Sequence, residues 1–290
     1  MTEKATALCH GAATIINAIA LGRGAAFGVD LWTTAEVKLT DEPQVIEGKI
    51  ISDPTEDPIL IKKTVDKVLE NFGLNGRFGA KVKTWSNVPI ARGLKSSSAA
   101  ANAVALAMVA ALNKKVDDST VINLGVDAAV EAKVTVTGAF DDACASYFGG
   151  AVITDNLKRR IVKHFKIADG LTVLFHVPAE KVYTIGSDVK GIKAIATLVK
   201  KPYKDALKGN CWSALTLNGL LFSSALGYNP SIAIEAILAG AVASGLSGKG
   251  PAVTALVPNE KIDSVKNAWQ VYEGEILQAK VNHEKAKVIG

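Results

Sequence analysis

The sequence is poor in cysteine, methionine and histidine, and it has no apolar stretch long enough to cross a bilayer. Its longest strongly apolar run, residues 103–112, falls well short of the ~20 residues that a membrane-spanning helix needs. Three scattered cysteines do not suit a disulfide framework, and the four histidines form no H-E-x-x-H or Cys/His metal motif. The first residues, MTEKATALCHG, lack the continuous apolar core of a secretory signal. We therefore expect a cytoplasmic protein without membrane contact, structural zinc or histidine-based catalysis.

Charge is also sparse and evenly spread. The 290 residues carry 33 Lys+Arg against 28 Asp+Glu, a formal net charge of +5. The basic residues occur as isolated pairs beside apolar positions, and no basic run is interleaved with aromatic residues. Such a pattern argues against nucleic-acid binding, whereas a mild positive field suits small anionic substrates. With 49% hydrophobic residues, the chain can bury a sizeable core, and its length favours two domains.

Hydrophobic periodicity predicts both strands and helices in the first half of the chain. Alternating apolar residues over 27–39 indicate a strand pair or one long bent strand, and a second alternation covers 78–83. The remaining elements are expected as helices at 58–72, 98–113 and 119–131 and as a strand at 151–154. The helix at 98–113 is apolar on nearly every face, which predicts an interior position.

The pattern of the second half predicts an antiparallel sheet backed by helices. The expected strands are 171–177, 252–257 and 275–281, and the expected helices are 187–200, 203–226, 230–243 and 261–272, with a glycine-rich loop at 244–252. This order predicts an α+β fold of two-layer α/β sandwich type. We place the domain boundary in the polar segment at 155–170, dividing the chain into domains 1–160 and 161–290.

The segment PIARGLKSSSAA, residues 89–100, is the strongest chemical signal. Gly93, Lys95 and three consecutive serines stand directly before the apolar helix. The first turn of a helix has backbone N–H groups without partners and a partial positive charge, so it suits phosphate oxygens. A plain serine-capped helix is the alternative, but one cap explains only one hydroxyl.

Two common nucleotide motifs are absent. Gly248-Lys249 is followed by Gly250, and the earlier glycine that a Walker A motif requires is Ala243. Gly22 and Gly24 begin a G-x-G pattern, but Phe27 stands where the third glycine of a Rossmann fingerprint belongs. A phosphate site at residues 89–100 must therefore be of another kind.

Three segments together resemble the motifs of the GHMP kinases, the family of galacto-, homoserine, mevalonate and phosphomevalonate kinases. PIARGLKSSSAA is similar to the family's second motif, TGAFDDACASYFGG to its aspartate-bearing segment, and SGLSGKGPAV to its glycine-rich third motif. Within the family, these segments and GAATIINAIALGRGAAFGVDL most resemble the archaeal-type shikimate kinases. The resemblance spans residues 89–254 in the right order.

The resemblance implies a ribosomal-protein-S5-like N-terminal domain and a ferredoxin-like C-terminal domain. It implies transfer of a phosphoryl group from ATP, with Mg²⁺, to the 3-hydroxyl of shikimate, a step of chorismate and aromatic amino-acid biosynthesis. Another GHMP small-molecule kinase, homoserine kinase first, is the alternative within enzymes. An S5-like RNA-binding module without catalysis is the alternative of another class. The oligomeric state stays open.

The resemblance also implies site residues. One of two adjacent carboxylates would be the catalytic base; we favour Asp142 over Asp141, and the other would serve as a turn or cap residue. Predicted substrate contacts are Asp30, Arg23 and Arg92, and predicted magnesium contacts are Ser97, Ser98 and Glu131, although a solvated helical role suits Glu131 equally. The expected ATP-binding residues are Pro89, Ile90, Ala91, Arg92, Gly93, Leu94, Lys95, Ser96, Ser97, Ser98, Ala99, Gly248 and Gly250.

The chain departs from the family pattern at two points. Lys95 replaces the usual second glycine of the loop, next to an additional serine, so the assignment of the hydroxyls is open by one position. The lysine that some members carry in their first motif has no counterpart in HGAATII, residues 10–16. Lys95 and Arg92 are the nearest cations in sequence that can replace it.

Overall fold

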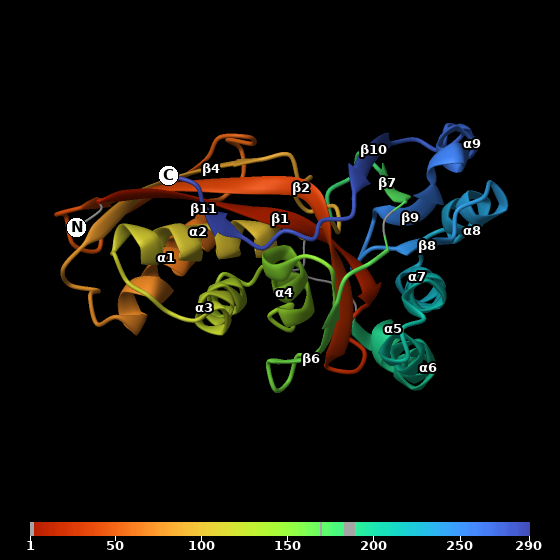
Figure 1. Ribbon diagram of the computed structural model, residues 1–290, viewed down its shortest axis with the longest axis horizontal. Coiled ribbons are helices and arrows are strands. Elements are labelled where there is room, and N and C mark those ends of the chain that lie inside the picture. The colour runs from red at the N-terminus through yellow and green to blue at the C-terminus, as the bar shows by residue number, and fades with distance from the viewer. Residues whose placement is uncertain (1–2, 169, 183–188) are drawn as a thin grey trace.

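Two β-sheets, each backed by helices, form an elongated molecule (Figure 1). The computed structural model describes residues 3–168, 170–182 and 189–290. The C-terminal strand β11 returns to the larger sheet to pair with β1, and Figure 1 shows the C-terminus beside the first strands. The architecture confirms the predicted α+β class.

The larger sheet has seven strands in the described chain and is built around two long ones. Strand β1 pairs antiparallel with β2 over almost its full length, and the other edge of β2 pairs with β5 at its beginning and with β4 at its end. The predicted alternation at 27–39 is thus one long strand. The sheet order is β11-β1-β2-β4-β3, with the β5–β6 hairpin joined to β2. The strands are β1 (Lys4–Ile16), β2 (Arg23–Thr40), β3 (Ile46–Ile50), β4 (Gly79–Ser86), β5 (Ala151–Asp155), β6 (Arg160–Phe165) and β11 (Lys287–Val288).

Four helices cover one face of this sheet, and Figure 1 shows them together on that side. They are α1 (Ile59–Asn71), α2 (Ser96–Ala111), α3 (Asp118–Glu131) and α4 (Phe140–Phe148). Helix α2 lies in the middle and packs against β1, β2, α1 and α3. Its small side chains permit this close approach on every side, which confirms the predicted interior position.

The smaller sheet has the antiparallel order β10-β7-β9-β8. Its strands are β7 (Leu171–Val177), β8 (Ala243–Leu246), β9 (Val253–Pro258) and β10 (Glu275–Lys280). The helices of this half are α5 (Val189–Ala194), α6 (Ala196–Leu207), α7 (Cys211–Leu226), α8 (Ser231–Leu238) and α9 (Ile262–Trp269), with a 3₁₀ turn at Asn259–Lys261. Within the described residues, no helix is long and apolar enough to span a membrane.

The predicted helices of this half need correction. The helix expected at 203–226 is interrupted, because Gly209 adopts a φ of 96° between α6 and α7. The helix expected at 187–200 begins outside the described residues and is divided between α5 and α6. The helix expected at 230–243 ends at Leu238, and Ala243 already begins strand β8. Apolar residues continued past the end of α8 because the short strand β8 is buried on both sides.

The division expected at 160/161 runs through the β5–β6 hairpin. Strand β6 pairs with β5 in the larger sheet, and β11 returns from the second half to pair with β1. The two halves also share one apolar core, in which Ile15 and Phe27 of the large sheet pack with Phe175 of the small one. This shared core fixes the end of β1 against the second half, where the site lies.

Candidate active site

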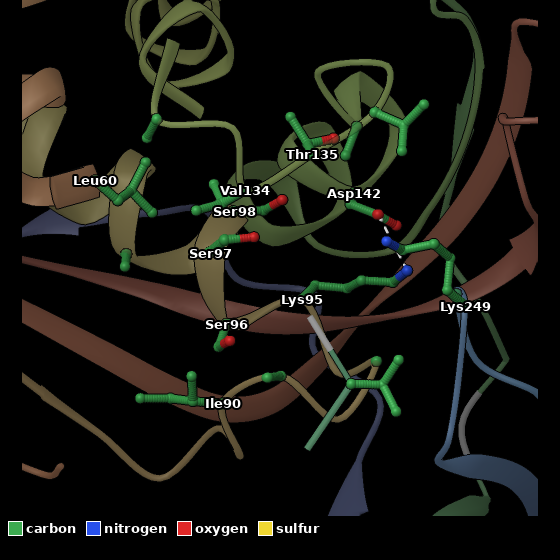
Figure 2. A pocket seen from close by; sticks show the side chains of 18 of the residues that line it. Leu60, Ile90, Lys95, Ser96, Ser97, Ser98, Val134, Thr135, Asp142 and Lys249 are labelled. Carbon is green, nitrogen blue, oxygen red and sulfur yellow. Dashed lines mark ion pairs between the residues drawn. The ribbon is translucent and has the colours of Figure 1, made fainter. Parts of the chain in front are cut away.

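A cavity of about 420 Å³ opens where α2 begins, where α4 begins and where the β8–β9 loop reaches across from the smaller sheet (Figure 2). Both predicted carboxylates, Asp141 and Asp142, line it. So do nine of the thirteen predicted ATP-binding residues: Ile90, Ala91, Gly93, Lys95, Ser96, Ser97, Ser98, Gly248 and Gly250. The fold thus brings the three motif segments to one cavity.

The N-terminal turn of α2 faces this cavity. Lys95 is the N-cap residue, with a left-handed φ of 66°, and within the described chain its side chain makes no cap hydrogen bond. The serines lie inside the first turn rather than at the cap, so the plain serine-capped helix is excluded. Three first-turn amides, the helix dipole and the Ser97 and Ser98 hydroxyls are therefore available to an anion.

The loop from the smaller sheet is fixed against this turn by hydrogen bonds. The Ser247 hydroxyl donates to the Gly93 carbonyl at 2.9 Å, and the Ala252 amide donates to the Arg92 carbonyl at 3.1 Å. Gly93 needs to be glycine here, because its φ is 88° and a Cβ would lie 2.4 Å from the Ser247 carbonyl oxygen. The glycine-rich segments of the two halves therefore form one continuous wall.

The end of β1 holds the same loop from the other side. The Gly248 amide donates to Thr14 Oγ1 at 2.9 Å, and Asn17 Nδ2 donates to the Gly248 carbonyl at 2.8 Å. The Asn17 amide in turn donates to Asn218 Oδ1 on α7. These buried hydrogen bonds fix the loop within the wall of the cavity.

The two carboxylates occupy the first turn of α4. Asp142 Oδ2 lies 3.1 Å from Lys95 Nζ, so the two helix starts are joined by an ion pair within the cavity. Asp141 Oδ1 accepts a hydrogen bond from Asn156 Nδ2 at 2.8 Å, and its Oδ2 lies against the backbone of Gly24. Asp142 is thus the carboxylate beside the N-terminal turn of α2, and Asp141 is held behind it.

Burial changes the acidity of both groups. Burial and the negative charge of Asp142 raise the pKa of Asp141 to about 7, against the opposing hydrogen bond from Asn156. Burial also raises the pKa of Asp142, but the Lys95 ammonium opposes this. Because the groups are coupled, they share their protons as a pair. The ion pair favours the charge on Asp142, with the proton on Asp141 near neutral pH.

Lys249 also lines the cavity, although it is not among the predicted site residues. Its side chain extends from the β8–β9 loop toward Lys95 and Asp142 in Figure 2. Burial and the charge of Lys95 lower the pKa of Lys249 to about 8. Its signal in the sequence is its place inside SGLSGKGPAV, the segment that resembles the family's third motif, between Gly248 and Gly250.

Three predicted contacts lie away from this cavity. Glu131 forms ion pairs with Lys63 and Lys67 of α1, at 2.7 and 2.9 Å, so the structure does not place it at a magnesium site. Asp30 accepts a hydrogen bond from the Lys280 amide in an exposed position. Arg23 is half exposed and lies 3.6 Å from Asp155.

Four further residues of the predicted loop do not face the cavity. Arg92 donates to the Pro178 carbonyl and lines a separate hollow beside β7, so it is a structural link rather than a contact in this cavity. Pro89 lines that same hollow. Leu94 and Ala99 are buried in the protein interior, where they support the loop from behind.

The oxygen donors at the cavity suit a magnesium ion held jointly with a nucleotide. No cluster of three or more metal-ligating side chains occurs in the described chain, which excludes a cage made by such side chains alone there. Asp142 Oδ1 is buried and has no hydrogen-bond partner among the described residues, and the Ser97 and Ser98 hydroxyls lie in the same lining. Mg²⁺ typically takes one or two such protein oxygens together with substrate phosphates and water.

Comparison with known proteins agrees with this geometry. The model of the GHMP kinases N terminal domain matches residues 60–150. The shikimate kinase of Methanosarcina mazei is 43% identical over 99% of this chain and 97% of its own length. That of Methanothermobacter thermautotrophicus is 40% identical over 100% of this chain and 99% of its own.

Solved structures show the same fold at low identity. Homoserine kinase from Cytophaga hutchinsonii matches 100% of this chain and 98% of its own, with a TM-score of 0.77 at 18% identity. Methanococcus jannaschii mevalonate kinase matches 96% of this chain and 98% of its own, with a TM-score of 0.75 at 18% identity. With its three motif segments gathered at one cavity and full-length relatives above 40% identity, the chain belongs to the archaeal shikimate kinases of the GHMP kinase family.

Proposed function

We propose that this enzyme transfers the terminal phosphoryl group of ATP to the 3-hydroxyl of shikimate, forming 3-phosphoshikimate for chorismate and aromatic amino-acid biosynthesis. The observation that carries the proposal is the Lys95–Asp142 pair, which joins a phosphate-binding helix start to a buried carboxylate. The names of the full-length relatives supply the substrate. The three buried free cysteines agree with the reducing cytoplasm as its compartment.

In this proposal, the start of α2 binds the triphosphate. The amides of its first turn donate to phosphate oxygens, and the Lys95 ammonium neutralises part of their charge. Ser97 and Ser98 would supply hydroxyl oxygens to a magnesium ion, which would neutralise phosphate charge when it is bound. Gly93 allows the β8–β9 loop to pack directly against this segment, because a Cβ would lie 2.4 Å from the Ser247 carbonyl oxygen.

Asp142 accepts the proton of the attacking hydroxyl. In the absence of phosphates, Lys95 lies against this carboxylate and lowers its basicity. A bound triphosphate attracts the same ammonium, so Asp142 becomes a stronger base when the phosphoryl donor is in place. Asp141 is held by Asn156, and its raised pKa favours the neutral acid. It therefore adds less negative charge beside the charge that develops on the phosphate.

The predicted substrate contacts do not enter this mechanism, because Asp30, Arg23 and Arg92 lie outside the cavity. The acceptor side is lined instead by neutral residues from the end of β1 and by the β8–β9 loop. On the β1 side these residues are Thr14, Asn17, Ala18 and Ile19. A small polar acceptor therefore lies between these residues and the carboxylates.

The test is ADP release in a coupled assay with shikimate, homoserine and mevalonate as acceptors. We expect turnover with shikimate at a kcat/KM at least about tenfold above that for either other alcohol, because a site that hydrogen-bonds its substrate rejects analogues that leave polar groups unpaired. Turnover with homoserine alone would assign another kinase activity. No turnover with any of them, together with RNA binding that weakens steeply with salt, would favour the S5-like binding module.

A further inference from the structure

Lys249 lies on the β8–β9 loop, which hydrogen bonds hold against the end of β1 and against Gly93. Its neighbours on both sides, Gly248 and Gly250, line the cavity with it. The Gly248 amide and carbonyl are both hydrogen-bonded to the end of β1, and Ser247 is bonded to Gly93. A Cβ at position 248 would also lie 2.6 Å from Lys95 Nζ, so the loop backbone packs directly on the first lysine. A backbone fixed in this way holds the Lys249 side chain in a defined position, as binding and catalytic sites require.

The electrostatic environment of Lys249 favours an additional anion. Two ammonium groups approach each other in a half-buried space, and their repulsion disfavours the charged form of Lys249. The Asp142 carboxylate already lies at ion-pair distance from Lys95. A phosphoryl group that arrives between the two lysines relieves their repulsion and gains from both charges. The repulsion between the two lysines is therefore present in the free protein and is relieved when the phosphoryl donor binds.

We propose that Lys249 is a catalytic residue that contacts the transferring phosphoryl group and stabilises the charge it develops in the transition state. This inference rests on the proposed kinase function. The β1-side residues that line the cavity are neutral in the described chain, so a cation on that side has to come from the β8–β9 loop. Lys249 thus makes the second half of the molecule a direct participant in the reaction.

The position of Lys249 favours the phosphoryl group over the carboxylate of shikimate. Figure 2 shows Lys95 and Lys249 converging on Asp142, the residue that receives the proton of the reacting hydroxyl. The phosphoryl group passes through that point, whereas the substrate carboxylate is separated from the 3-hydroxyl by part of the ring. Transition-state and ground-state interactions leave different kinetic signatures, so the two assignments are separable.

Steady-state kinetics of K249Q and K249R test the assignment, with K208Q as a matched control at an exposed lysine of the same half. We expect K249Q to lose at least ~100-fold in kcat, the scale of one lost electrostatic contact to a transition state, with KM for shikimate within about threefold of wild type. K249R should recover part of the loss, and K208Q should match wild type. A raised KM for shikimate with kcat preserved would overturn the proposal and assign Lys249 to the substrate carboxylate.

Two further readouts separate a catalytic from a structural role. The kcat/KM of the wild type should fall as the pH rises above about 8, where Lys249 loses its proton, and K249R should lose this alkaline limb. Affinity for ADP with aluminium fluoride and shikimate should fall at least tenfold in K249Q, while affinity for ADP alone stays within about twofold. Equal loss of both affinities would overturn the proposal. If shikimate is not phosphorylated but another alcohol is, the substrate proposal fails and the comparison is made with that alcohol.

Discussion

The ammonium of Lys95 lies 3.1 Å from the carboxylate of Asp142, although the two residues come from the first turns of different helices. Each side chain is only about one-tenth exposed, at 10% and 11%. At this burial an ion pair is sensitive to any third charge, and the triphosphate of a nucleotide is such a charge. In the proposed mechanism, this contact couples binding of the donor to activation of the acceptor.

Removing the Asp142 carboxylate should separate binding from chemistry. In D142N we expect kcat to fall roughly 10²- to 10⁴-fold, the contribution of a positioned general base, with ATP affinity within about threefold of wild type. Single-turnover kinetics and ATP titration measure the two quantities. D141N is the matched control, because its amide oxygen can still accept the hydrogen bond from Asn156. A severe loss in D141N with normal turnover in D142N would assign the base to Asp141 instead.

The raised pKa of Asp141 predicts a pH-dependent stability difference. Because its folded-state pKa of about 7 exceeds the ordinary aspartate value of 3.8, the folded protein holds this proton more tightly, and stability is lost as the pH rises from about 4 to 7. The expected cost is of the order of 1.4 kcal/mol for each unit of pKa difference. D141N should therefore be more stable than wild type in urea at pH 8, and the gain should shrink toward pH 5. The variant D41N, at an exposed aspartate, is the control and should show no such pH-dependent gain. A gain in D141N that stays constant from pH 5 to 8, or no gain relative to D41N, would contradict the raised pKa of Asp141.

Gly93 and Gly73 form a matched pair for the phosphate loop. Both have a positive φ, 88° and 65°, so alanine at either position adds backbone strain of about 1–2 kcal/mol. Only at position 93 does the new Cβ also meet a backbone oxygen, whereas nothing lies within 4 Å at position 73. G93A should lower ATP affinity at least tenfold, and G73A should leave it unchanged, as measured by titration of both folded variants. Normal ATP affinity in G93A would remove this segment from the nucleotide site.

The hydroxyl of Thr14 tests the anchoring of the β8–β9 loop. T14V removes the acceptor of the buried Gly248 amide, which should cost about 1–3 kcal/mol of stability. We expect kcat to fall with stability, because Lys249 follows Gly248 directly. T14S keeps the hydroxyl and should retain both properties. If T14V unfolds at the wild-type denaturant midpoint and keeps full kcat, the Thr14 hydroxyl does not anchor the β8–β9 loop.

Local chemistry made the helix start at residues 95–98 predictable from sequence. The glycine, the lysine and the serines before an all-apolar helix lie together in the chain, and short-range rules suffice for a helix start. The same is true of Asp141 and Asp142, which share one turn. The sequence limited the proposed base to this pair, and the approach of Lys95 to Asp142 is what distinguishes the two in the structure.

Long-range packing determines the positions of the residues that could not be placed from the sequence. Lys249 reaches the site because the β8–β9 loop packs against the end of β1, more than 230 positions away in the chain. Asp30 is turned outward by a bulge, where the β1–β2 register shifts between His10 and Gly11. Glu131 lies on the face of α3 that meets the lysines of α1. None of these outcomes depends on nearby sequence alone.

A crystal structure with a non-hydrolysable ATP analogue and shikimate would test the central claim most directly. We expect the triphosphate to contact the first-turn amides at residues 96–98, and the 3-hydroxyl to lie within hydrogen-bond distance of Asp142, with Lys95 shifted toward the phosphates. A nucleotide bound away from the start of α2, or a shikimate hydroxyl out of reach of both carboxylates, would contradict the account.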